Sequence, residues 1–398
     1  MPGSGTVILQ PGRERSVLRR HPWIFSGAVA HIRGNPADGD IVEVHDAGGQ
    51  WLARGYLNRR SQITVRLLTW DPAEAINADF WKRRLQRALQ GRADLLRSTH
   101  TTAFRLVHAE SDGLPGLIVD RYGEFEVIQF PTLGIERWKE TLVSLLVGLL
   151  SPRGIYERSD VDVREKEGLP MNTGLLWGDS PPPLLEVWEN GLRFRVDVRT
   201  GQKTGFYLDQ RENRARLAPF SPGAEVLDAF CYTGAFGVYA ARHGAARVTF
   251  VDSSGPALEL ARENLSLNGL SPDNHEFVEG DVARVLRAFR AAGRRFDLII
   301  LDPPKFAPSA QDVPRAARAY KDINLQAFHL LRPGGTLFST SCSGAVSADL
   351  FQKILFGAAL DAGRDVQILG HLHQGSDHPV SLNFPEGTYL KGFICRAL

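Results

Sequence analysis

Short apolar or alternating runs, separated by turn residues, dominate the first part of the chain. The clearest of these runs are residues 6–9, 41–45, 51–57 and 63–68. Runs this short, bounded by glycine, aspartate and asparagine, are typical of β-strands joined by tight turns. The pattern therefore predicts a small β-rich module, to which we assign residues 1–72.

A second pattern, which mixes helical and strand character, follows in the middle of the chain. Residues 79–98 carry apolar side chains at helical spacing, and Asn77 or Asp79 can cap that helix. Three strand-like runs, a second helical run and a further strand follow at residues 104–110, 116–123, 125–130, 135–150 and 154–158. Three consecutive prolines at 181–183 cannot continue a regular element. We therefore assign residues 73–185 to a central α+β domain.

From about residue 186 onward, strand and helix signals alternate. A hairpin pattern at residues 185–198 comes first. The strand-like runs after it are residues 225–228, 247–252, 275–278, 296–301, 335–340, 366–369 and 390–396. Helical runs lie between most of them, including residues 255–269 and 320–331. This alternation predicts an α/β fold with a mostly parallel, doubly wound sheet, to which we assign residues 186–398.

Composition narrows the class of protein. No apolar run is long enough to span a membrane, because residues 142–150 fall short of the roughly 18 residues that a spanning helix needs. The N-terminus lacks a secretory signal pattern, so we expect a cytoplasmic protein. The three cysteines are too scattered for a disulfide framework or a metal centre, so we expect no metal.

The net charge of +2 says little about partners, but the arginines are unevenly placed. Arg13, Arg15, Arg19 and Arg20 lie close together near the N-terminus. A local basic face can bind the phosphates of a nucleic acid even on a nearly neutral protein. The alternative, an arginine-rich surface that is only solvated, stays open.

Acidic residues stand at the ends of three successive predicted strands. Asp228 lies near the end of the first parallel strand, Asp252 ends the second, and Asp281 follows the third. Because ligands of doubly wound sheets bind at the carboxyl ends of the strands, these acids suit an adenosine-bearing cofactor. The turn with Gly234 and Gly237 lacks the glycine fingerprint of dinucleotide-binding proteins, and the chain has no P-loop motif. The pattern favours S-adenosylmethionine, with Asp228 near its positively charged methionine end.

The fourth parallel strand ends in a rigid turn that starts with Asp302 and Pro303. Proline fixes its own φ angle and restrains the residue before it. The Pro303 carbonyl and the Asp302 carboxylate can then grip the amine edge of a planar base, on which Phe306 can stack. Enzymes that modify a base must first take it out of its stack. This turn therefore predicts a pocket for a nucleobase.

Cys342 follows the fifth strand and is predicted to face the same crevice as Asp302. A thiolate that adds to carbon 6 of a pyrimidine makes carbon 5 nucleophilic, so the cysteine indicates covalent catalysis of carbon-5 methylation. Lys305 supplies positive charge that favours ionisation of the thiol. Cys231 and Cys395 are expected to be buried packing residues, the usual fate of a free cysteine.

A set of motifs carries a resemblance to a known family. In chain order they are RHPWIFSGAV, SDGLPGLIVDRYG, KTGFYLDQRENR, FCYTGAFGVYAA, LDPPKF, SCSG and DHPVSLNFPEGTYLKGF. With them the chain resembles, over nearly its full length, the three-domain ribosomal large-subunit RNA cytosine-5 methyltransferases. The resemblance implies an N-terminal PUA domain, a central α+β domain and a C-terminal Rossmann-like class I methyltransferase domain.

The resemblance also implies roles for individual residues. Cys342 matches the nucleophilic cysteine of the family. The cofactor site combines the matched segments with the strand ends: Phe206, Tyr207, Gln210, Asp228, Phe230, Tyr232, Thr233, Gly234, Phe236, Asp252, Ser253, Asp281, Asp302 and Pro303. The expected RNA contacts are Arg13, Arg19, Arg20, His21 and Phe306. Trp23 and Phe25 are expected in the core. The base that removes the carbon-5 proton is not identified, with His378 and Glu386 as candidates.

The predicted function is therefore S-adenosylmethionine-dependent formation of 5-methylcytidine in 23S ribosomal RNA through a covalent cysteine adduct. Relatives suggest a homodimer. Two alternatives stay open. One is a guanine-nitrogen methyltransferase that uses the same cofactor but needs no cysteine. The other is an inactive PUA-type RNA-binding assembly factor.

Overall fold

The computed structural model describes residues 5–398, which form two compact units. The first unit comprises the chain up to Val187 together with Val196–Leu208 and Ser376–Gly387. The second unit comprises Trp188–Arg195, Asp209–Gly375 and Thr388–Leu398. The boundaries predicted near residues 72 and 185 stay predictions.

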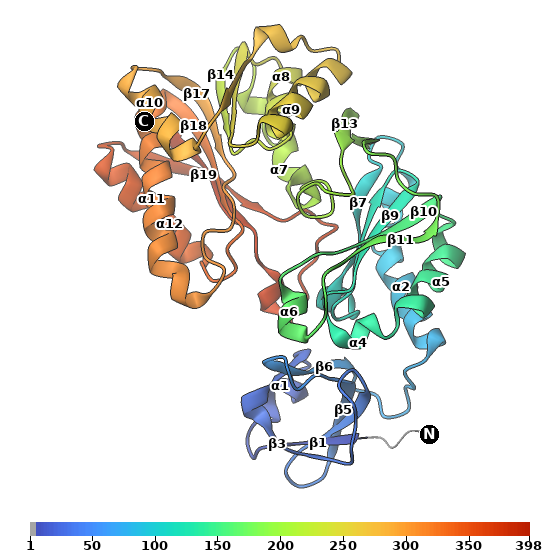
Figure 1. Ribbon diagram of the computed structural model, residues 1–398. Helices are drawn as coiled ribbons and strands as arrows, with labels where there is room; N and C mark the ends of the chain where they lie inside the picture. Colours follow the sequence, from blue (N-terminus) through green and yellow to red (C-terminus); the bar gives the residue numbers. More distant parts are fainter. Residues whose placement is uncertain (1–4) are drawn as a thin grey trace. The chain divides into compact units, whose positions relative to one another are not determined.

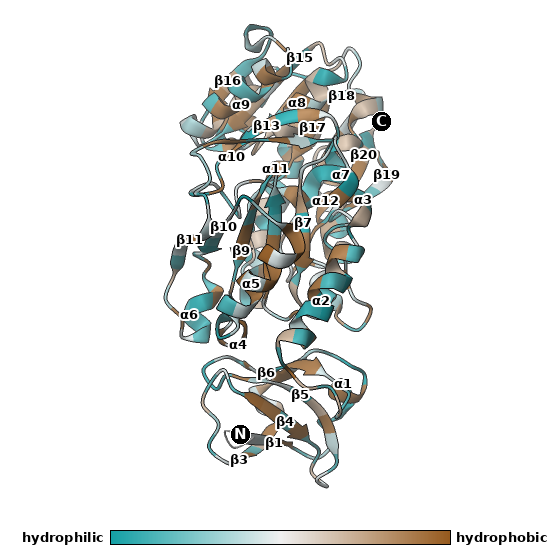
Figure 2. Cartoon of the chain, turned by 90° about the vertical axis from the view of Figure 1, so that its right-hand side faces the viewer, coloured by the Kyte–Doolittle hydropathy of each residue, from teal (hydrophilic) through white to brown (hydrophobic). Residues whose placement is uncertain are grey.

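The first unit begins with a six-stranded sheet in the order β2-β6-β5-β4-β1-β3. Its strands are β1 Gly5–Leu9, β2 Trp23–Phe25, β3 Val29–Arg33, β4 Ile41–His45, β5 Trp51–Leu57 and β6 Ile63–Thr69, with the short helix α1 Arg15–Leu18 after β1. Along β4, buried residues alternate with half-buried ones, so Val42 and Val44 point into the core. Figure 2 shows hydrophobic residues along β4. This sheet is the β-rich module that the sequence predicts.

A five-stranded sheet, ordered β11-β10-β9-β8-β7, forms the rest of the first unit's framework. Its strands are β7 Ala103–His108, β8 Ile118–Tyr122, β9 Phe125–Gln129, β10 Gly154–Ser159 and β11 Asn172–Gly178; the helices are α2 Ala78–Gln90, α3 Ala93–Arg97, α4 Leu133–Glu136, α5 Lys139–Leu150 and α6 Val163–Glu167. Helices α2 and α5 pack on this sheet through a shared core that includes Trp81 and Leu146 (Figure 1). The Asn77 side chain caps α2 by accepting from the Phe80 N–H. The helix predicted over 79–98 is interrupted near Gly91, where α2 ends.

The second unit is built on a seven-stranded sheet in the order β16-β15-β14-β17-β18-β20-β19. Its strands are β14 Glu225–Ala229, β15 Arg247–Asp252, β16 Glu276–Glu279, β17 Phe296–Leu301, β18 Leu331–Ser341, β19 Val366–His373 and β20 Lys391–Ala397. Strands β14 to β18 pair in parallel, whereas β20 runs antiparallel to both β18 and β19. The mostly parallel sheet confirms the predicted Rossmann-like α/β fold. The predicted hairpin forms β12 Leu185–Glu189 and β13 Leu192–Val196.

Helices lie on the segments that connect the strands of this sheet, except for the short helix α7, which precedes β14. They are α7 Arg211–Ala215, α8 Ala235–Arg242, α9 Gly255–Leu267, α10 Val282–Ala291, α11 Val313–Leu330 and α12 Ala348–Asp361. Helices α10, α11 and α12 share one core with the sheet, to which Leu286, Tyr320 and Phe351 contribute. Figure 1 shows α8 and α9 gathered apart from α11 and α12. No helix within residues 5–398 is long and apolar enough to cross a membrane.

Candidate active site

The loop after β14 has a backbone conformation that few side chains adopt. Phe230 and Tyr232 have φ angles of 62° and 49°, and Gly234 has a φ of 78°. Left-handed backbone at non-glycine residues costs free energy and is concentrated at functional sites. Helix α8 then starts close to the sheet, because a Cβ on Gly237 would lie 2.1 Å from the Phe250 ring. The loop is thus shaped by strain and by glycine at the place predicted for the cofactor.

Asp228 lies buried beneath this loop at the end of β14. Its Oδ2 accepts from the Gly237 N–H at 2.8 Å, while its Oδ1 is buried without a hydrogen-bond partner among the described residues. Burial raises the pKa of Asp228 to about 7; the Gly237 bond opposes this shift, and the charges of Asp302 and Asp252 add to it. The Thr233 hydroxyl oxygen is likewise buried and unpartnered within residues 5–398. Orphaned buried polar atoms of this kind are satisfied in native proteins by a ligand or by water.

The next two strand ends carry the other predicted acids. Asp252 ends β15, where its two oxygens accept from the Tyr232 N–H at 2.8 Å and the Ser254 N–H at 3.0 Å. Ser253 follows at the surface. Asp281 caps helix α10 by accepting from the Arg284 N–H at 2.9 Å. Asp281 therefore has a structural task as well as its predicted position at the cofactor edge.

The Asp302 turn is fixed by hydrogen bonds from two other segments. Asp302 Oδ1 accepts from Gln210 Nε2 at 2.8 Å and from the Thr340 hydroxyl at 2.6 Å. Gln210 is in turn held by Asn213, which donates to its Oε1 at 2.6 Å. The structure thus brings Gln210 and Asp302 together, as expected of two residues that serve one site. Asn213 and Thr340 were not identified from the sequence, although Asn213 lies within the KTGFYLDQRENR motif.

Cys342 follows β18 directly and is partly exposed. Its Sγ lies 4.0 Å from the Pro303 carbonyl oxygen. Tyr320 on α11 holds the loop on both sides of the cysteine, because its hydroxyl bonds to Ser341 at 2.9 Å and to Ser343 at 3.0 Å. Cys342 and the Pro303 carbonyl therefore lie close together, just beyond the carboxyl ends of the neighbouring strands β18 and β17.

The other two cysteines behave differently. Cys231 and Cys395 are both buried, which confirms the expectation that they pack in the core. Burial raises the pKa of the Cys395 thiol to about 12 and also raises that of Cys231. Both are therefore poor nucleophiles at neutral pH, since the thiolate is the reactive form.

Lys391 is a residue of this site that the strand-by-strand reading of the sequence missed. It begins β20 and pairs with Ser341 of β18. Its side chain is 7% exposed, and its Nζ donates to the Ser343 carbonyl at 2.6 Å. The only sequence signal was its place in the DHPVSLNFPEGTYLKGF motif.

A buried ion pair supports the segment that carries Gln210. Arg214 of α7 donates to both oxygens of Glu189, at 2.7 and 2.6 Å, and both side chains are at most 2% exposed. The Arg214 guanidinium also lies 5.8 Å from the centre of the Phe236 ring in the first turn of α8. Two planar N–H···O bonds fix the orientation of a guanidinium more firmly than one. The pair therefore ties α7 to the end of β12.

Several predicted residues belong to the first unit or have other partners. Phe206 and Tyr207 belong to the first unit, where the Phe206 N–H donates to the Tyr122 hydroxyl at 3.2 Å. The base candidates also belong there: His378 is buried 3.1 Å from Asp377 Oδ1, and Glu386 contacts His21. Phe306 packs against Tyr320 with ring centres 4.8 Å apart. Its stacking on a base stays a prediction.

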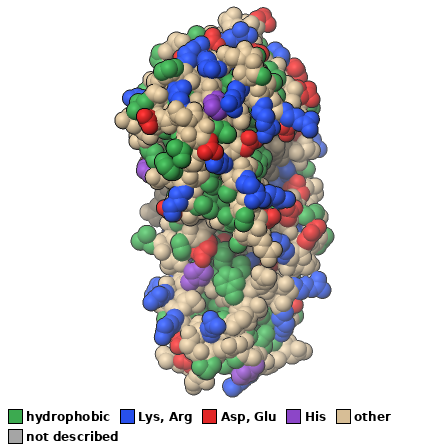
Figure 3. All heavy atoms as spheres, turned by 90° about the vertical axis from the view of Figure 1, so that its left-hand side faces the viewer, with side chains coloured by type: hydrophobic (Ala, Val, Ile, Leu, Met, Phe, Trp, Pro, Cys, Tyr) green, Lys and Arg blue, Asp and Glu red, His purple; other side chains and the backbone are tan. Residues whose placement is uncertain are grey.

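Four of the five predicted RNA contacts lie in the first unit, whereas Phe306 belongs to the second. Arg13, Arg19 and Arg20 are exposed, and His21 Nε2 lies 3.1 Å from Glu386 Oε2. Phe25 is 49% exposed, so the expectation that it lies in the core is wrong, because β2 is at the sheet's edge. Trp23 is half-buried against Phe384, with ring centres 4.7 Å apart. On the face drawn in Figure 3, basic side chains are dispersed among acidic and apolar ones.

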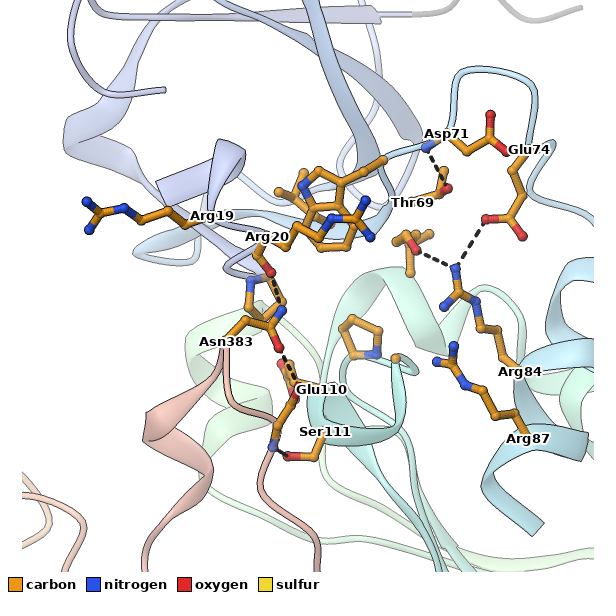
Figure 4. A pocket seen from close by; sticks show the side chains of 17 residues that line it. Arg19, Arg20, Thr69, Asp71, Glu74, Arg84, Arg87, Glu110, Ser111 and Asn383 are labelled. Carbon is orange, nitrogen blue, oxygen red and sulfur yellow. Dashed lines mark hydrogen bonds and ion pairs between the residues drawn. The ribbon is translucent and has the colours of Figure 1, made fainter. Parts of the chain in front are cut away.

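A cavity of about 510 Å³ lies beside this region. Arg19 and Arg20 line it together with Arg84 and Arg87 of α2. Figure 4 shows Arg84 and Arg87 reaching in from α2, with Arg20 on the other side. Its acidic lining consists of Asp71, Glu74 and Glu110.

The carboxylate acceptors at the strand ends fit S-adenosylmethionine. Asp228 can receive the positive methionine end, Asp252 a ribose diol and Asp281 an exocyclic amine. The unpartnered Asp228 and Thr233 oxygens are the observation that supports a polar, positively charged ligand. No group of three or more metal-ligating side chains occurs in the part of the chain that the structure describes.

Comparisons with known proteins agree with this geometry. Residues 7–70 match a PUA-like domain, and residues 173–365 match an S-adenosylmethionine-dependent methyltransferase domain. A protein named ribosomal RNA large subunit methyltransferase I from Shewanella amazonensis is 53% identical over 390 residues, which cover 98% of each chain. A protein of the same name from Aeromonas hydrophila is 51% identical and covers 99% of this chain and 100% of its own.

Solved structures show the same fold. A SAM-dependent methyltransferase from Streptococcus mutans superimposes with a TM-score of 0.85 at 23% identity, covering 98% of this chain and 99% of its own. A methyltransferase complexed with SAH gives a TM-score of 0.86 at 23% identity with the same coverage.

Proposed function

We propose that the chain, which belongs to the family of ribosomal RNA large subunit methyltransferases I, forms 5-methylcytidine in 23S ribosomal RNA with S-adenosylmethionine as methyl donor. The observation that carries this proposal is the position of Cys342. Its thiol faces the Pro303 carbonyl at the strand ends, and it is the one cysteine of the three that is not buried. Methylation of a ring or exocyclic nitrogen would leave this thiol without a role.

The chain's own residues prepare the base, and S-adenosylmethionine supplies the methyl group when bound. The Pro303 carbonyl accepts from the 4-amino group of the cytosine and orients the ring. The Cys342 thiolate then forms a bond to carbon 6, which moves electron density to carbon 5. After the methyl group has arrived, a base or a water molecule takes the proton from carbon 5, and the electron pair of that bond re-forms the ring double bond and expels the Cys342 thiolate. The aromatic ring and the thiolate are thereby restored.

Asp302 orients this site through the turn that it begins. Hydrogen bonds from Gln210 and Thr340 fix its carboxylate, so the following Pro303 carbonyl is held at a constant place. A positioned acceptor of this kind needs no reorganisation when the substrate arrives. Lys305, in the same turn, is exposed and contributes positive charge near the thiol.

The RNA is bound through the first unit in this proposal. Arg13, Arg19, Arg20 and His21 contact its phosphates, which is supported by the exposure of the three arginines and by the PUA-like match over residues 7–70. Recognition of single-stranded bases rather than of duplex sequence is the usual mode of RNA-binding modules.

A methyl-transfer assay tests the reaction, the base and the nucleophile together. The substrate is protein-free 23S RNA from a strain that lacks the enzyme, and the product nucleoside is identified by mass spectrometry. Wild type should form 5-methylcytidine and Cys342→Ala none, while Cys395→Ala is the matched control and should stay active. RNA that contains 5-fluorocytosine should trap a covalent adduct on wild type and on Cys395→Ala, but not on Cys342→Ala.

Two outcomes would overturn the proposal. A methylated guanosine, formed equally by Cys342→Ala, would identify a nitrogen methyltransferase and return the cysteine to a packing role. Tight binding of S-adenosylmethionine and RNA without any methylated product would identify an RNA-binding assembly factor.

A further inference from the structure

The end of β20 places an amine beside the nucleophile. Because β20 runs antiparallel to β18, its first residue lies where β18 ends, and Lys391 pairs with Ser341. The Nζ donates to the Ser343 carbonyl, the peptide on the other side of Cys342. Register and hydrogen bond together tether the amine to the three-residue segment that has the thiol at its centre.

The surroundings leave the charge of this amine without a fixed counter-ion. Within residues 5–398, Lys391 is buried and no carboxylate lies within salt-bridge distance of its Nζ. A buried ammonium that has only a carbonyl partner is costly, and an anion nearby repays part of that cost. Burial lowers the pKa of Lys391 to about 8; an ionised Cys342 opposes this shift, and Lys305 adds to it.

The other polar groups around the thiol do not compete for this role. Burial raises the pKa of the Tyr320 hydroxyl, which therefore stays protonated as it bonds to Ser341 and Ser343. The Asp302 carboxylate is engaged by Gln210 and Thr340. Lys305 is exposed in the turn and is the second cation near the site.

We propose that Lys391 is the positioning residue that keeps Cys342 as a thiolate. The S–H bond of Cys342 breaks, its proton forms a bond to the neutral Nζ of Lys391, and the result is a thiolate beside an ammonium. Atoms and charges balance without another reactant. This inference rests on the proposed function for the catalytic use of the thiolate. Whether Cys342 is a thiolate at all can be tested without RNA.

The test is the pH dependence of alkylation of Cys342 by iodoacetamide, followed on the full chain by peptide mass spectrometry. In wild type the rate should rise with a midpoint at least about one unit below the ordinary thiol value of roughly 8.5. Lys391→Met should move that midpoint up by about one pH unit or more and slow alkylation at neutral pH roughly tenfold. Lys391→Arg, which keeps the positive charge, should retain a low midpoint.

Two results would overturn the inference. A wild-type midpoint at or above about 8.5 would do so without any variant, even if Lys391→Met failed to fold. So would identical profiles for wild type and Lys391→Met, with S-adenosylmethionine binding as the check of folding. If alkylation behaves as expected but the RNA product is a methylated guanosine, the proposed function fails and the activated thiol remains.

A second inference comes independently from the cavity in the first unit. The guanidinium groups of Arg84 and Arg87 converge there, since a Cβ on Gly113 would lie 3.2 Å from Arg84 Nη1 and 2.6 Å from Arg87 Nη2. Burial lowers the pKa of Arg84, and the neighbouring charge of Arg87 adds to that shift. Two like charges held together are relieved by an anion that contacts both.

The available acids do not neutralise this pair fully. Glu74 is shared between Arg84 and Arg83, whereas the hydrogen bond of Arg87 goes to the Asp112 carbonyl. The cavity of about 510 Å³ is in the size range of sites that take a nucleotide. Arg20 lines the same cavity from the β-rich module.

We infer that Arg84, Arg87 and Arg20 hold a phosphate of a single-stranded RNA segment in this cavity. Arg97, which lies on α3 and is 72% exposed, offers a matched control outside it. The probe is a labelled single-stranded RNA oligonucleotide, whose binding is measured by anisotropy over a series of salt concentrations.

Arg87→Gln and Arg20→Gln should each weaken binding and reduce the slope of log Kd against log salt by about 0.7. Arg97→Gln should leave both quantities unchanged. Inorganic phosphate should compete for the wild-type site more effectively than for the Arg87→Gln site. Equal slopes for wild type, Arg87→Gln and Arg97→Gln would refute the inference, whether or not the chain methylates RNA.

Discussion

Protonation of Asp228 should control the affinity for S-adenosylmethionine. Burial raises the pKa of this carboxyl group to about 7 in the chain without ligand, with Asp302 and Asp252 adding to the shift. The cofactor has a positively charged methionine end and prefers the ionised carboxylate. Below neutral pH most molecules carry a neutral Asp228 and must release a proton before they bind tightly.

The magnitude follows from the ionised fraction. With a pKa of about 7, that fraction is about 3% at pH 5.5 and about 90% at pH 8, so the apparent affinity should rise about 30-fold between them. Folding stability depends on pH in the opposite direction to cofactor affinity. Because the pKa of Asp228 in the folded chain lies above the ordinary aspartate value of 3.8, the neutral form favours the fold at low pH. That contribution, on the order of 4 kcal/mol, is lost as pH rises from about 4 to about 7.

Isothermal titration calorimetry at several pH values, in buffers of different ionisation enthalpy, measures both the affinity and the released proton. Asp228→Asn is the matched control, because it keeps the shape and cannot ionise. Its affinity should be weak and independent of pH. A wild-type affinity that stays constant from pH 5.5 to 8, or an equal pH slope in Asp228→Asn, would refute the reasoning.

Three further changes test the framework of the site. Arg214→Met should lower the free energy of unfolding by about 3–5 kcal/mol in denaturant titration, because it strands the buried Glu189 carboxylate; a loss below about 1 kcal/mol would contradict this. Gly237→Ala should lower the free energy of unfolding by about 1–3 kcal/mol and weaken cofactor binding, because the new methyl group meets the Phe250 ring. An unchanged melting temperature would argue against this prediction. Asp281→Asn should keep the α10 cap and hence the stability, yet reduce cofactor affinity about tenfold, an effect worth about 1.4 kcal/mol; unchanged affinity would leave Asp281 a cap alone.

Much of the second unit could be predicted from the sequence because parallel strands share a carboxyl edge. Once β14, β15 and β17 are identified, Asp228, Asp252 and Asp302 must lie along one edge of the sheet. The acids along that edge, together with the absence of a dinucleotide-binding glycine fingerprint and of a P-loop motif, indicated S-adenosylmethionine. Such reasoning depends only on strand direction, which a βαβ pattern determines well.

Contacts between distant segments could not be predicted in the same way. The segment Ser376–Gly387 belongs to the first unit, although it lies close to the C-terminus. His378 and Glu386 therefore find their partners among residues of that unit. Periodicity cannot reveal this, because it reports on one element at a time and not on which core that element joins. The break of the predicted helix near Gly91 is a smaller case, since apolar spacing continues across it.

Lys391 shows which signal was missing and how it could be sought. The carboxyl ends of the parallel strands β14 to β18 point to the residues that follow those strands. They give no reason to choose a residue that precedes a strand. Antiparallel β20 reverses that rule, because its first residue meets the last residue of β18. In a mixed sheet of this kind, the residue before or at the start of an antiparallel strand is placed as well for catalysis as those after the parallel strands. The amine tethered beside Cys342 therefore follows from the topology of the sheet.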